Sequence, residues 1–404
     1  MLRTPVLRVC LTLAVSALAV LALAPLRASA ADVAGVTADS ITIGMFGPIS
    51  GSYSAHRVVY DGAQAVYKQV NDQGGLFGRK IKVVFEDDGC DIGRARAAVK
   101  KLISRDKVFL LHGGVCSASA YAVRQEAIDE GVPFMVMAAT MDKITEPVNH
   151  FVFTTTLTGS KSGQTIGDFI RSMPEVKKVA IVKHPDDWSE VQVTSLDARL
   201  ADAGIKVAST VEEERNAADA TTQVLSIKEA APDATAVILY PAEMAVFLRD
   251  SLKYGLKGPF ITPVVGMDMH EIEDRAGSLK AVSDVYTGSF LIGAPGSKQA
   301  QPYVDLFKKY YPDESVQALD FYGMSGAYAI VEALRRAGPD LSREKFIAAL
   351  ETLKDFNAGP SACTITITPE NHQGCESGTI WTLVGNDIVA IGPTWKAVKG
   401  GATN

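Results

Sequence analysis

Apolar residues follow two different periodicities along the chain. Runs of consecutive apolar residues, such as 108–111, are typical of buried parallel strands. Elsewhere apolar residues recur every three or four positions, as at Val59, Ala63 and Val66, which indicates one buried face of a helix. Because the two patterns alternate, the sequence favours parallel sheets with helices on both faces.

The alternation occupies two successive stretches of the chain. In the first, we expect a helix at 57–71 and strands at 41–45, 81–85, 108–111 and 133–137. After Thr154–Thr156 it resumes, with helices at 191–203, 222–230 and 242–254 and strands at 179–182, 205–210, 236–240 and 260–265. A return strand at 285–290 precedes helices at 299–311, 319–337 and 343–353. Segments 363–368 and 378–384 alternate like exposed antiparallel strands.

Residues 1–30 have the composition of a secretory signal peptide. Arg3 and Arg8 precede an apolar core at 9–24, and Ala28–Ala30 form a small-residue cleavage site. The apolar run is too short for a membrane span, and no later segment approaches one. We therefore expect an exported protein of residues 31–404 that is not inserted in a membrane.

Charge and cysteine content narrow the function. The chain has 40 basic and 46 acidic residues and a formal net charge of −6, which excludes nucleic acid and anionic membranes as partners. Cys10 lies in the predicted signal peptide, so four of the five cysteines remain in the exported chain: Cys90, Cys116, Cys363 and Cys375. An even number in an exported chain favours two disulfides. The polar stretch between the last two cysteines suits a short closed loop. Metal binding is the alternative, but CxxC and HExxH spacings are absent from the sequence.

Signatures of catalysis are scarce. The segment Gly323–Gly326 resembles a nucleophile elbow only loosely and lies within a helical pattern. Gly74–Gly78 follows a helix instead of a strand, so it indicates a turn and not a nucleotide-binding loop. The sequence therefore predicts a binding protein that is not an enzyme and needs no cofactor.

One strand-to-helix junction has the character of an anion site. In VFLLHGGVCSASAY, residues 108–121, an apolar run leads through Gly113 and Gly114 into a helical pattern that begins near Ser117. A helix N-terminus offers unpaired N–H groups and the positive end of the helix dipole, which suit a carboxylate. The alternative is that Ser117 simply caps the helix.

Four motifs occur in a fixed order: ITIGMFGPISGSYS, YDGAQAVYKQVNDQGGLFGRKIKVVFEDDGCD, VCSASA and PFMVMAAT. In this order they resemble the periplasmic substrate-binding proteins of branched-chain amino acid ABC transporters, the Leu/Ile/Val-binding type. The resemblance implies a type I periplasmic-binding fold: two doubly wound α/β lobes, three crossovers and a ligand cleft between the lobes that closes by hinge bending. The expected lobes are 31–157 with 287–362, and 158–286 with 363–404.

The resemblance also implies partners and a ligand site. It implies a periplasmic monomer that delivers a small molecule to an inner-membrane ABC permease, and a Cys90–Cys116 disulfide. The hydroxyl and N–H of Ser117 would hold the ligand carboxylate, and the carbonyl of Ala138 and the hydroxyl of Thr140 would be further ligand partners from the next strand end. The aromatic residues expected around the ligand are Phe46, Tyr53, Trp188, Tyr240 and Tyr322. Trp188 and Tyr240 have the alternative of packing as buried aromatics.

One position departs from the family pattern. Amino-acid binders of this type place an acid after the fourth strand of the second lobe to neutralise the α-ammonium, whereas here Val264 or Val265 stands there. An ammonium without a counter-charge is costly in a closed cleft, so we expect an aromatic or other apolar carboxylate without an α-amino group. Glu243 or Asp268 could replace the missing acid. The alternatives are therefore a binder of branched-chain amino acids, other amino acids or amides, and a sensory module for a membrane receptor.

Overall fold

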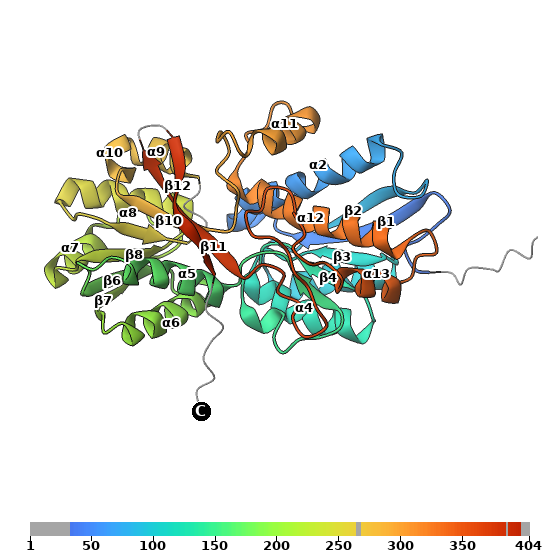
Figure 1. Ribbon diagram of the computed structural model, residues 1–404, viewed down its shortest axis with the longest axis horizontal. Coiled ribbons are helices and arrows are strands. Elements are labelled where there is room, and N and C mark those ends of the chain that lie inside the picture. The colour runs from blue at the N-terminus through green and yellow to red at the C-terminus, as the bar shows by residue number, and fades with distance from the viewer. Residues whose placement is uncertain (1–32, 264–267, 385–386, 397–404) are drawn as a thin grey trace, which may run out of the picture. The chain divides into compact units, whose positions relative to one another are not determined.

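The computed structural model describes residues 33–263, 268–384 and 387–396. Residues from Ala34 onward form one compact unit that contains two separate β-sheets with helices around them (Figure 1). The predicted signal peptide, 1–30, lies outside the described residues.

The first sheet consists of five parallel strands in the order β2-β1-β3-β4-β5. Its strands are β1 Ser40–Gly47, β2 Lys80–Asp87, β3 Leu110–Gly113, β4 Phe134–Val136 and β5 Val152–Thr154. The helices between them are α2 Val58–Asp72, α3 Ile92–Ser104 and α4 Ser117–Asp129, and a 3₁₀ helix, Gly51–Arg57, precedes α2. The Asp91 side chain accepts a hydrogen bond from the N–H of Arg94 and so caps α3.

The second sheet has seven strands in the order β12-β11-β10-β9-β8-β6-β7. Its parallel strands are β6 Lys178–Lys183, β7 Lys206–Glu212, β8 Ala234–Ile238, β9 Phe260–Thr262 and β10 Val285–Ser289. Two antiparallel strands complete it, β11 Ser377–Val384 and β12 Asp387–Lys396. The surrounding helices are α5 Gly159–Arg171, α6 Asp187–Asp202, α7 Thr221–Ala230, α8 Pro241–Tyr254, α9 Met269–Ala276 and α10 Leu279–Val282.

Both faces of the second sheet are covered. Ile181 belongs to a core that includes residues of α5 and α6, whereas its neighbours Ala180 and Val182 belong to a core with residues of α7 to α10. Successive residues of a strand point to opposite faces, so the two cores lie on opposite sides of the sheet. The predicted doubly wound α/β class is confirmed here.

The chain passes between the sheets three times: after β5, after β10 and before β11. Helices α11 Gln301–Tyr310, α12 Ala318–Ala337 and α13 Arg343–Leu350 lie between the second and third crossings. In Figure 1, α12 (orange) lies along α2 (blue) of the first sheet. The two helices lie so close together that a Cβ on Gly323 would be 1.8 Å from the carbonyl oxygen of Val59. Gly323 therefore serves helix packing and not a nucleophile elbow.

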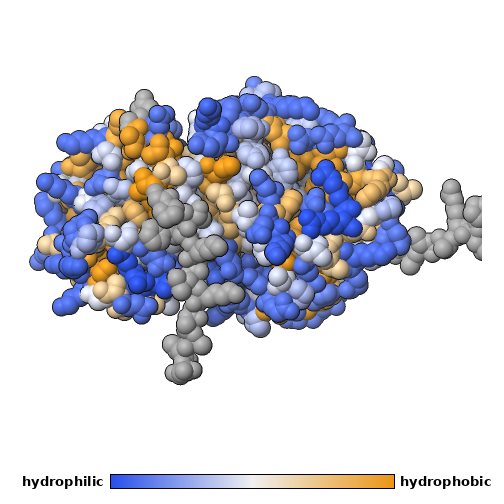
Figure 2. All heavy atoms as spheres, viewed as in Figure 1, coloured by the Kyte–Doolittle hydropathy of each residue, from blue (hydrophilic) through white to orange (hydrophobic). Residues whose placement is uncertain are grey.

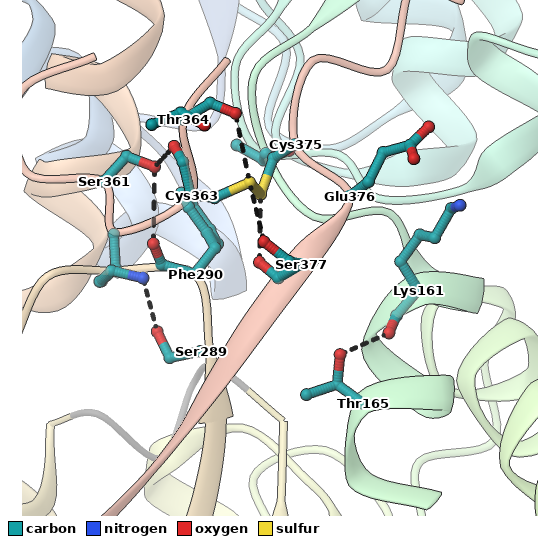
Figure 3. The surroundings of a disulfide bond; sticks show 12 residues. Lys161, Thr165, Ser289, Phe290, Ser361, Cys363, Thr364, Cys375, Glu376 and Ser377 are labelled. Atoms are coloured by element: carbon teal, nitrogen blue, oxygen red, sulfur yellow. Dashed lines mark hydrogen bonds between the residues drawn. A yellow bond between two sulfur atoms is a disulfide. The ribbon is translucent and has the colours of Figure 1, made fainter. Parts of the chain in front are cut away.

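The third crossing carries a disulfide. Cys363 and Cys375 are bonded, with their Cα atoms 5.7 Å apart. Figure 3 shows the bond beside Ser377, the first residue of β11, and Phe290, which follows β10. The expected lobe boundaries remain a prediction, although β10 stays in the second sheet as far as Ser289.

The expectation of exposed strands at the C-terminal end is wrong in two respects. Residues 363–368 form only isolated bridges, such as Phe356–Ile365, and β11 is buried over most of its length. The expectation of an exposed strand face rested on the polar residues Thr379 and Thr382. The Thr382 hydroxyl instead donates a 2.8 Å hydrogen bond to the carbonyl of Val285, which allows it to be buried.

The side of the molecule drawn in Figure 2 is largely hydrophilic. On the face drawn in Figure 2, hydrophilic residues cover most of the described surface and hydrophobic residues form separate small groups. Across the described ranges, no helix is both long and apolar enough to cross a membrane.

Candidate functional site

Three cavities share Tyr240 as a common wall residue. We call them the inner cavity, of about 50 Å³, the second cavity, of about 230 Å³, and the third cavity, of about 300 Å³. The inner cavity is lined mainly by apolar and hydroxyl residues, including Ala138, Thr140, Leu157, Ser162, Trp188 and Tyr322. The second cavity carries charged groups, among them Arg215, Glu243 and Asp268, and the third is lined by Tyr53, Ser117, Trp188 and Arg215.

Buried hydroxyls without partners line these cavities. Helix α4 begins at Ser117, directly after β3, and its N-cap residue is Cys116. Ser117 is therefore the first helical residue and its side chain caps nothing. The hydroxyl oxygens of Ser117, Thr140 and Ser162 are buried and have no hydrogen-bond partner. Such groups are costly when unpaired, so each is available to a ligand.

A disulfide fixes the start of α4. Cys90 follows β2, and its sulfur is bonded to that of Cys116, with the two Cα atoms 5.6 Å apart. Both cysteines line the third cavity beside Ser117. The bond therefore ties the loop after β2 to the helix start that presents the hydroxyl and the free N–H groups of the first turn.

Aromatic residues that follow strands of the second sheet provide apolar surface at the site. Trp188 lies in the first turn of α6, which Asp186 caps by accepting a 3.0 Å hydrogen bond from the N–H of Ser189. Tyr240 follows β8 and precedes Pro241, the first residue of α8. The rings of Trp188 and Tyr240 are stacked, with centroids 4.5 Å apart and planes at 28°. Loops at the ends of two neighbouring strands thus build one aromatic wall.

The structure brings most of the predicted residues together. Ala138, Thr140, Trp188, Tyr240 and Tyr322 line the inner cavity, and Tyr53 and Ser117 line the third, which shares Trp188 and Tyr240 with it. Tyr322 also packs edge-on against Phe290 at 4.7 Å, so only part of it is available.

Phe46 is not among the residues that line the three cavities, so the structure does not bring it to the site with the other predicted residues. Its side chain is fully buried in the first core, 5.6 Å from the ring of Phe134. The residue precedes the glycine-rich loop in sequence but still belongs to β1, which is buried on both faces.

Asp268 is one of the two acids that could neutralise a ligand ammonium in place of the missing acid. Val264 and Val265 lie outside the described residues. Asp268 lines the inner and second cavities and accepts a 2.8 Å hydrogen bond from the N–H of Ala318. Burial raises the pKa of Asp268 to about 7, so the carboxyl is only partly ionised at neutral pH.

Glu243 is already engaged by the protein. One carboxylate oxygen accepts a 2.7 Å hydrogen bond from the N–H of Asn216. The other lies 3.8 Å from Nε2 of His184, but that nitrogen accepts the N–H of Tyr240 while Nδ1 faces the carbonyl of Glu213. His184 is therefore neutral, and burial lowers its pKa.

Sequence reasoning missed Arg215, His56 and Ser162. Arg215 follows β7, and its guanidinium carbon lies 3.7 Å from the ring centroid of Tyr240 and 5.4 Å from that of Tyr53. His56 contacts Tyr240 edge-on at 5.2 Å, and burial lowers its pKa to about 4, so it is neutral. The available signal for Arg215 was its place after a strand end, where ligands of open α/β sheets bind.

Comparison with known proteins identifies the family of the chain. The family model of periplasmic binding proteins matches residues 40–386. The leucine-, isoleucine-, valine-, threonine- and alanine-binding protein of Pseudomonas aeruginosa is 30% identical over 323 residues, which cover 78% of this chain and 83% of that protein.

Solved structures show the same fold. A branched-chain amino acid ABC transporter protein from Thermus thermophilus with bound valine has a TM-score of 0.80 at 18% identity, covering 90% of this chain and 98% of that one. A solute-binding protein of an ABC transporter from R. palustris in complex with benzoate has a TM-score of 0.75 at 21% identity, covering 88% and 98%. The predicted family is confirmed: the chain belongs to the periplasmic binding proteins and has their type I fold.

Proposed function

We propose that this protein is the periplasmic solute-binding component of an ABC importer, and that it captures a small aromatic or other apolar carboxylate for delivery to an inner-membrane permease. The ligands named for two similar proteins support this proposal. The Pseudomonas aeruginosa relative is named for binding apolar and small amino acids, and the R. palustris neighbour holds benzoate. Both ligands carry a carboxylate, and they differ in the α-amino group.

The observation that carries the proposal is the pairing of unsatisfied hydroxyls with an aromatic wall. Ser117 and Thr140 present buried hydroxyls without partners, and the first turn of α4 adds N–H groups and the positive end of its dipole. Hydroxyl and N–H donors of this kind suit a carboxylate, which accepts hydrogen bonds from both. The stacked Trp188 and Tyr240 provide apolar surface for the body of the ligand.

The acids near the site favour a ligand without an ammonium group. Asp268 has a pKa near 7 because it is buried, and Glu243 already accepts the N–H of Asn216. An ammonium in the cavity would depend on ionising the first or redirecting the second, and an incompletely paired buried charge is costly.

An α-amino acid is the second candidate. Its support is the presence of both carboxyl groups in the second cavity, next to the inner one, together with the relative that binds such ligands. A sensory module is the further alternative, and binding of the liganded protein to a purified permease or to a receptor domain distinguishes transport from sensing.

The double variant Ser117→Ala/Thr140→Ala tests the carboxylate site. Benzoate at roughly 100 times Kd should stabilise the wild-type protein by about 2.7 kcal/mol, measured by thermal unfolding. The double variant should lose this stabilisation because the carboxylate has lost two donors. Ser119→Ala is the matched control, since Ser119 is also a buried, unpartnered serine of α4 but lies outside the three cavities. An equal shift in wild type and double variant would refute the carboxylate site.

A further inference from the structure

Arg215 occupies an unusual place beside the aromatic wall. Its guanidinium carbon is 3.7 Å from the ring centroid of Tyr240, whereas Trp188 is stacked on the same ring at 4.5 Å. One face of a phenol ring has no room for both groups at these distances. Arg215 and Trp188 therefore cover opposite faces of Tyr240, and the three side chains form a sandwich.

Several contacts hold Arg215 in this position. Its guanidinium forms an ion pair with Asp186, the residue that also caps α6 and lies two residues before Trp188. The next residue along the chain, Asn216, has a left-handed backbone with φ of 59°, and its N–H donates to Glu243. The loop that carries Arg215 is thus tied to both helices that supply the aromatic residues.

The sandwich decides which aromatic surface a ligand can meet. Both faces of Tyr240 are covered, so Tyr240 offers the cavities its edge and its hydroxyl. Trp188 is stacked against Tyr240, packs in part against the apolar core formed with α5 and α6, and lines the inner and third cavities. The indole surface that a ligand can meet is therefore the part of Trp188 that lines these cavities.

We propose that Arg215 is a positioning residue that, with Asp186, clamps Tyr240 against Trp188 and so makes the site selective for planar aromatic carboxylates over puckered aliphatic ones. The inference rests on the proposed function and deepens it by naming the ligand class. Arg215 acts through Tyr240 because its guanidinium is occupied by Asp186 on one side and by the ring on another. A fixed indole face should bind a flat ring more tightly than a puckered one, whereas a mobile indole can adapt to either shape.

The test compares benzoate with cyclohexanecarboxylate, which share the carboxylate and differ in ring planarity. Isothermal titration calorimetry on the wild type should show tighter binding of benzoate. Arg215→Met should weaken benzoate roughly 3- to 10-fold and cyclohexanecarboxylate by less than about 2-fold, as expected for loss of one aromatic contact. Arg215→Lys keeps the charge but not the planar fork, and should lie between wild type and Arg215→Met.

Two further variants separate positioning from a general loss of charge. Asp186→Asn retains an oxygen that caps α6 but loses the ion pair, so it should also weaken benzoate selectively, and adding it to Arg215→Met should have little further effect. Arg171→Met removes another arginine paired with an aspartate, on α5, and should leave both affinities unchanged.

Near-ultraviolet circular dichroism provides a readout that does not depend on a ligand. The stacked Trp188 and Tyr240 should give a signal that changes in Arg215→Met and is absent from Trp188→Phe. Equal weakening of both carboxylates would make Arg215 a direct anion contact and overturn the inference, as would unchanged selectivity. If the wild type binds neither carboxylate, the proposed function fails, and the dichroism alone decides: an altered signal in Arg215→Met supports the clamp and an unaltered one refutes it.

Discussion

Glu213 is a buried carboxyl group that the ligand site does not explain. Its side chain is 1% exposed, and neither carboxylate oxygen has a hydrogen-bond partner. Burial, and then the nearby Asp219, Glu243 and Asp250, raise the pKa of Glu213 to about 7. In the pH range between the ordinary value of a glutamate and 7, the folded protein therefore binds a proton that the unfolded chain has released, and stability falls as the pH rises.

The variant Glu213→Gln should remove much of this dependence. We expect the free energy of unfolding of the wild type to fall by about 1–3 kcal/mol between about pH 5 and about pH 8, and that of the variant to fall less. Urea denaturation at both pH values measures the difference. Glu175→Gln changes an exposed glutamate that is not among the charges acting on Glu213 and should keep the wild-type slope. If Glu213→Gln also keeps that slope, the carboxyl is not protonated in the folded protein.

Individual site residues differ in how far sequence predicts them. Ser117 and Thr140 follow strands whose apolar runs are plain, so their place at a sheet edge is local information. Arg215 also follows a strand, but in the run Glu-Glu-Arg, which is typical of a solvated loop. Its stacking on Tyr240 depends on contacts between residues distant in sequence. Phe46 shows the opposite case, because a position near a motif does not tell whether a residue still lies within the buried strand β1.

At the scale of elements, glycines set the distance between helices. Gly62 of α2 and Gly323 of α12 face each other's backbones, and an added Cβ would lie 2.0 Å from the carbonyl oxygen of Asp320 and 1.8 Å from that of Val59, respectively. The two helices can approach this closely only because both positions lack a side chain.

The substitution Gly323→Ala should therefore destabilise the protein despite the better helix propensity of alanine. We expect a loss of about 1–3 kcal/mol in the free energy of unfolding, since the helices must separate to admit the methyl group. Arg335→Ala, on an exposed position of the same helix, should change it by less than about 0.5 kcal/mol. Chemical denaturation measures both, and a neutral Gly323→Ala would show that α12 shifts freely against α2.

The two disulfides should have different effects on binding. Cys90–Cys116 lies at the start of α4 and lines the third cavity, whereas Cys363–Cys375 lies outside the three cavities and beside the start of β11 (Figure 3). Replacing the latter pair with alanines should cost about 2–3 kcal/mol of stability through the entropy of the opened loop, with benzoate affinity retained. Replacing Cys90 and Cys116 should weaken benzoate as well. Equal affinities in the two variants, measured by calorimetry, would contradict the role given to the first bond.

Elements with clear periodicity were predictable, and elements rich in glycine were not. The expected helices at 242–254 and 319–337 correspond closely to α8 and α12. Helix α5 was missed because three glycines weaken its helical signal. Packing requires glycine at position 163, since a Cβ on Gly163 would lie 2.1 Å from the carbonyl oxygen of Gln192 in α6. The close packing of α5 on α6 thus requires glycine at a position where a stronger helix former would have made the helix easier to predict from sequence.

At the scale of the whole molecule, the site combines chemistry from both sheets. Hydroxyls and helix N–H groups come from the first sheet through Ser117 and Thr140, and aromatic surface comes from the second through Trp188 and Tyr240. A ligand that contacts both groups stabilises the arrangement in which they meet, so binding and conformation are linked. The sequence predicts each half from local patterns, but their meeting depends on three crossings of the chain and could be expected only from the family resemblance.

Ligand preference tests the central claim most directly. Isothermal titration calorimetry of the wild-type protein with benzoate and with leucine compares two carboxylates that differ in the aromatic ring and in the α-ammonium. We predict that benzoate binds at least about tenfold more tightly, because each 1.4 kcal/mol of differential interaction is a factor of ten and the site offers leucine no fully ionised, free counter-charge. Tighter binding of leucine would contradict the account and assign the ammonium to Asp268 or Glu243.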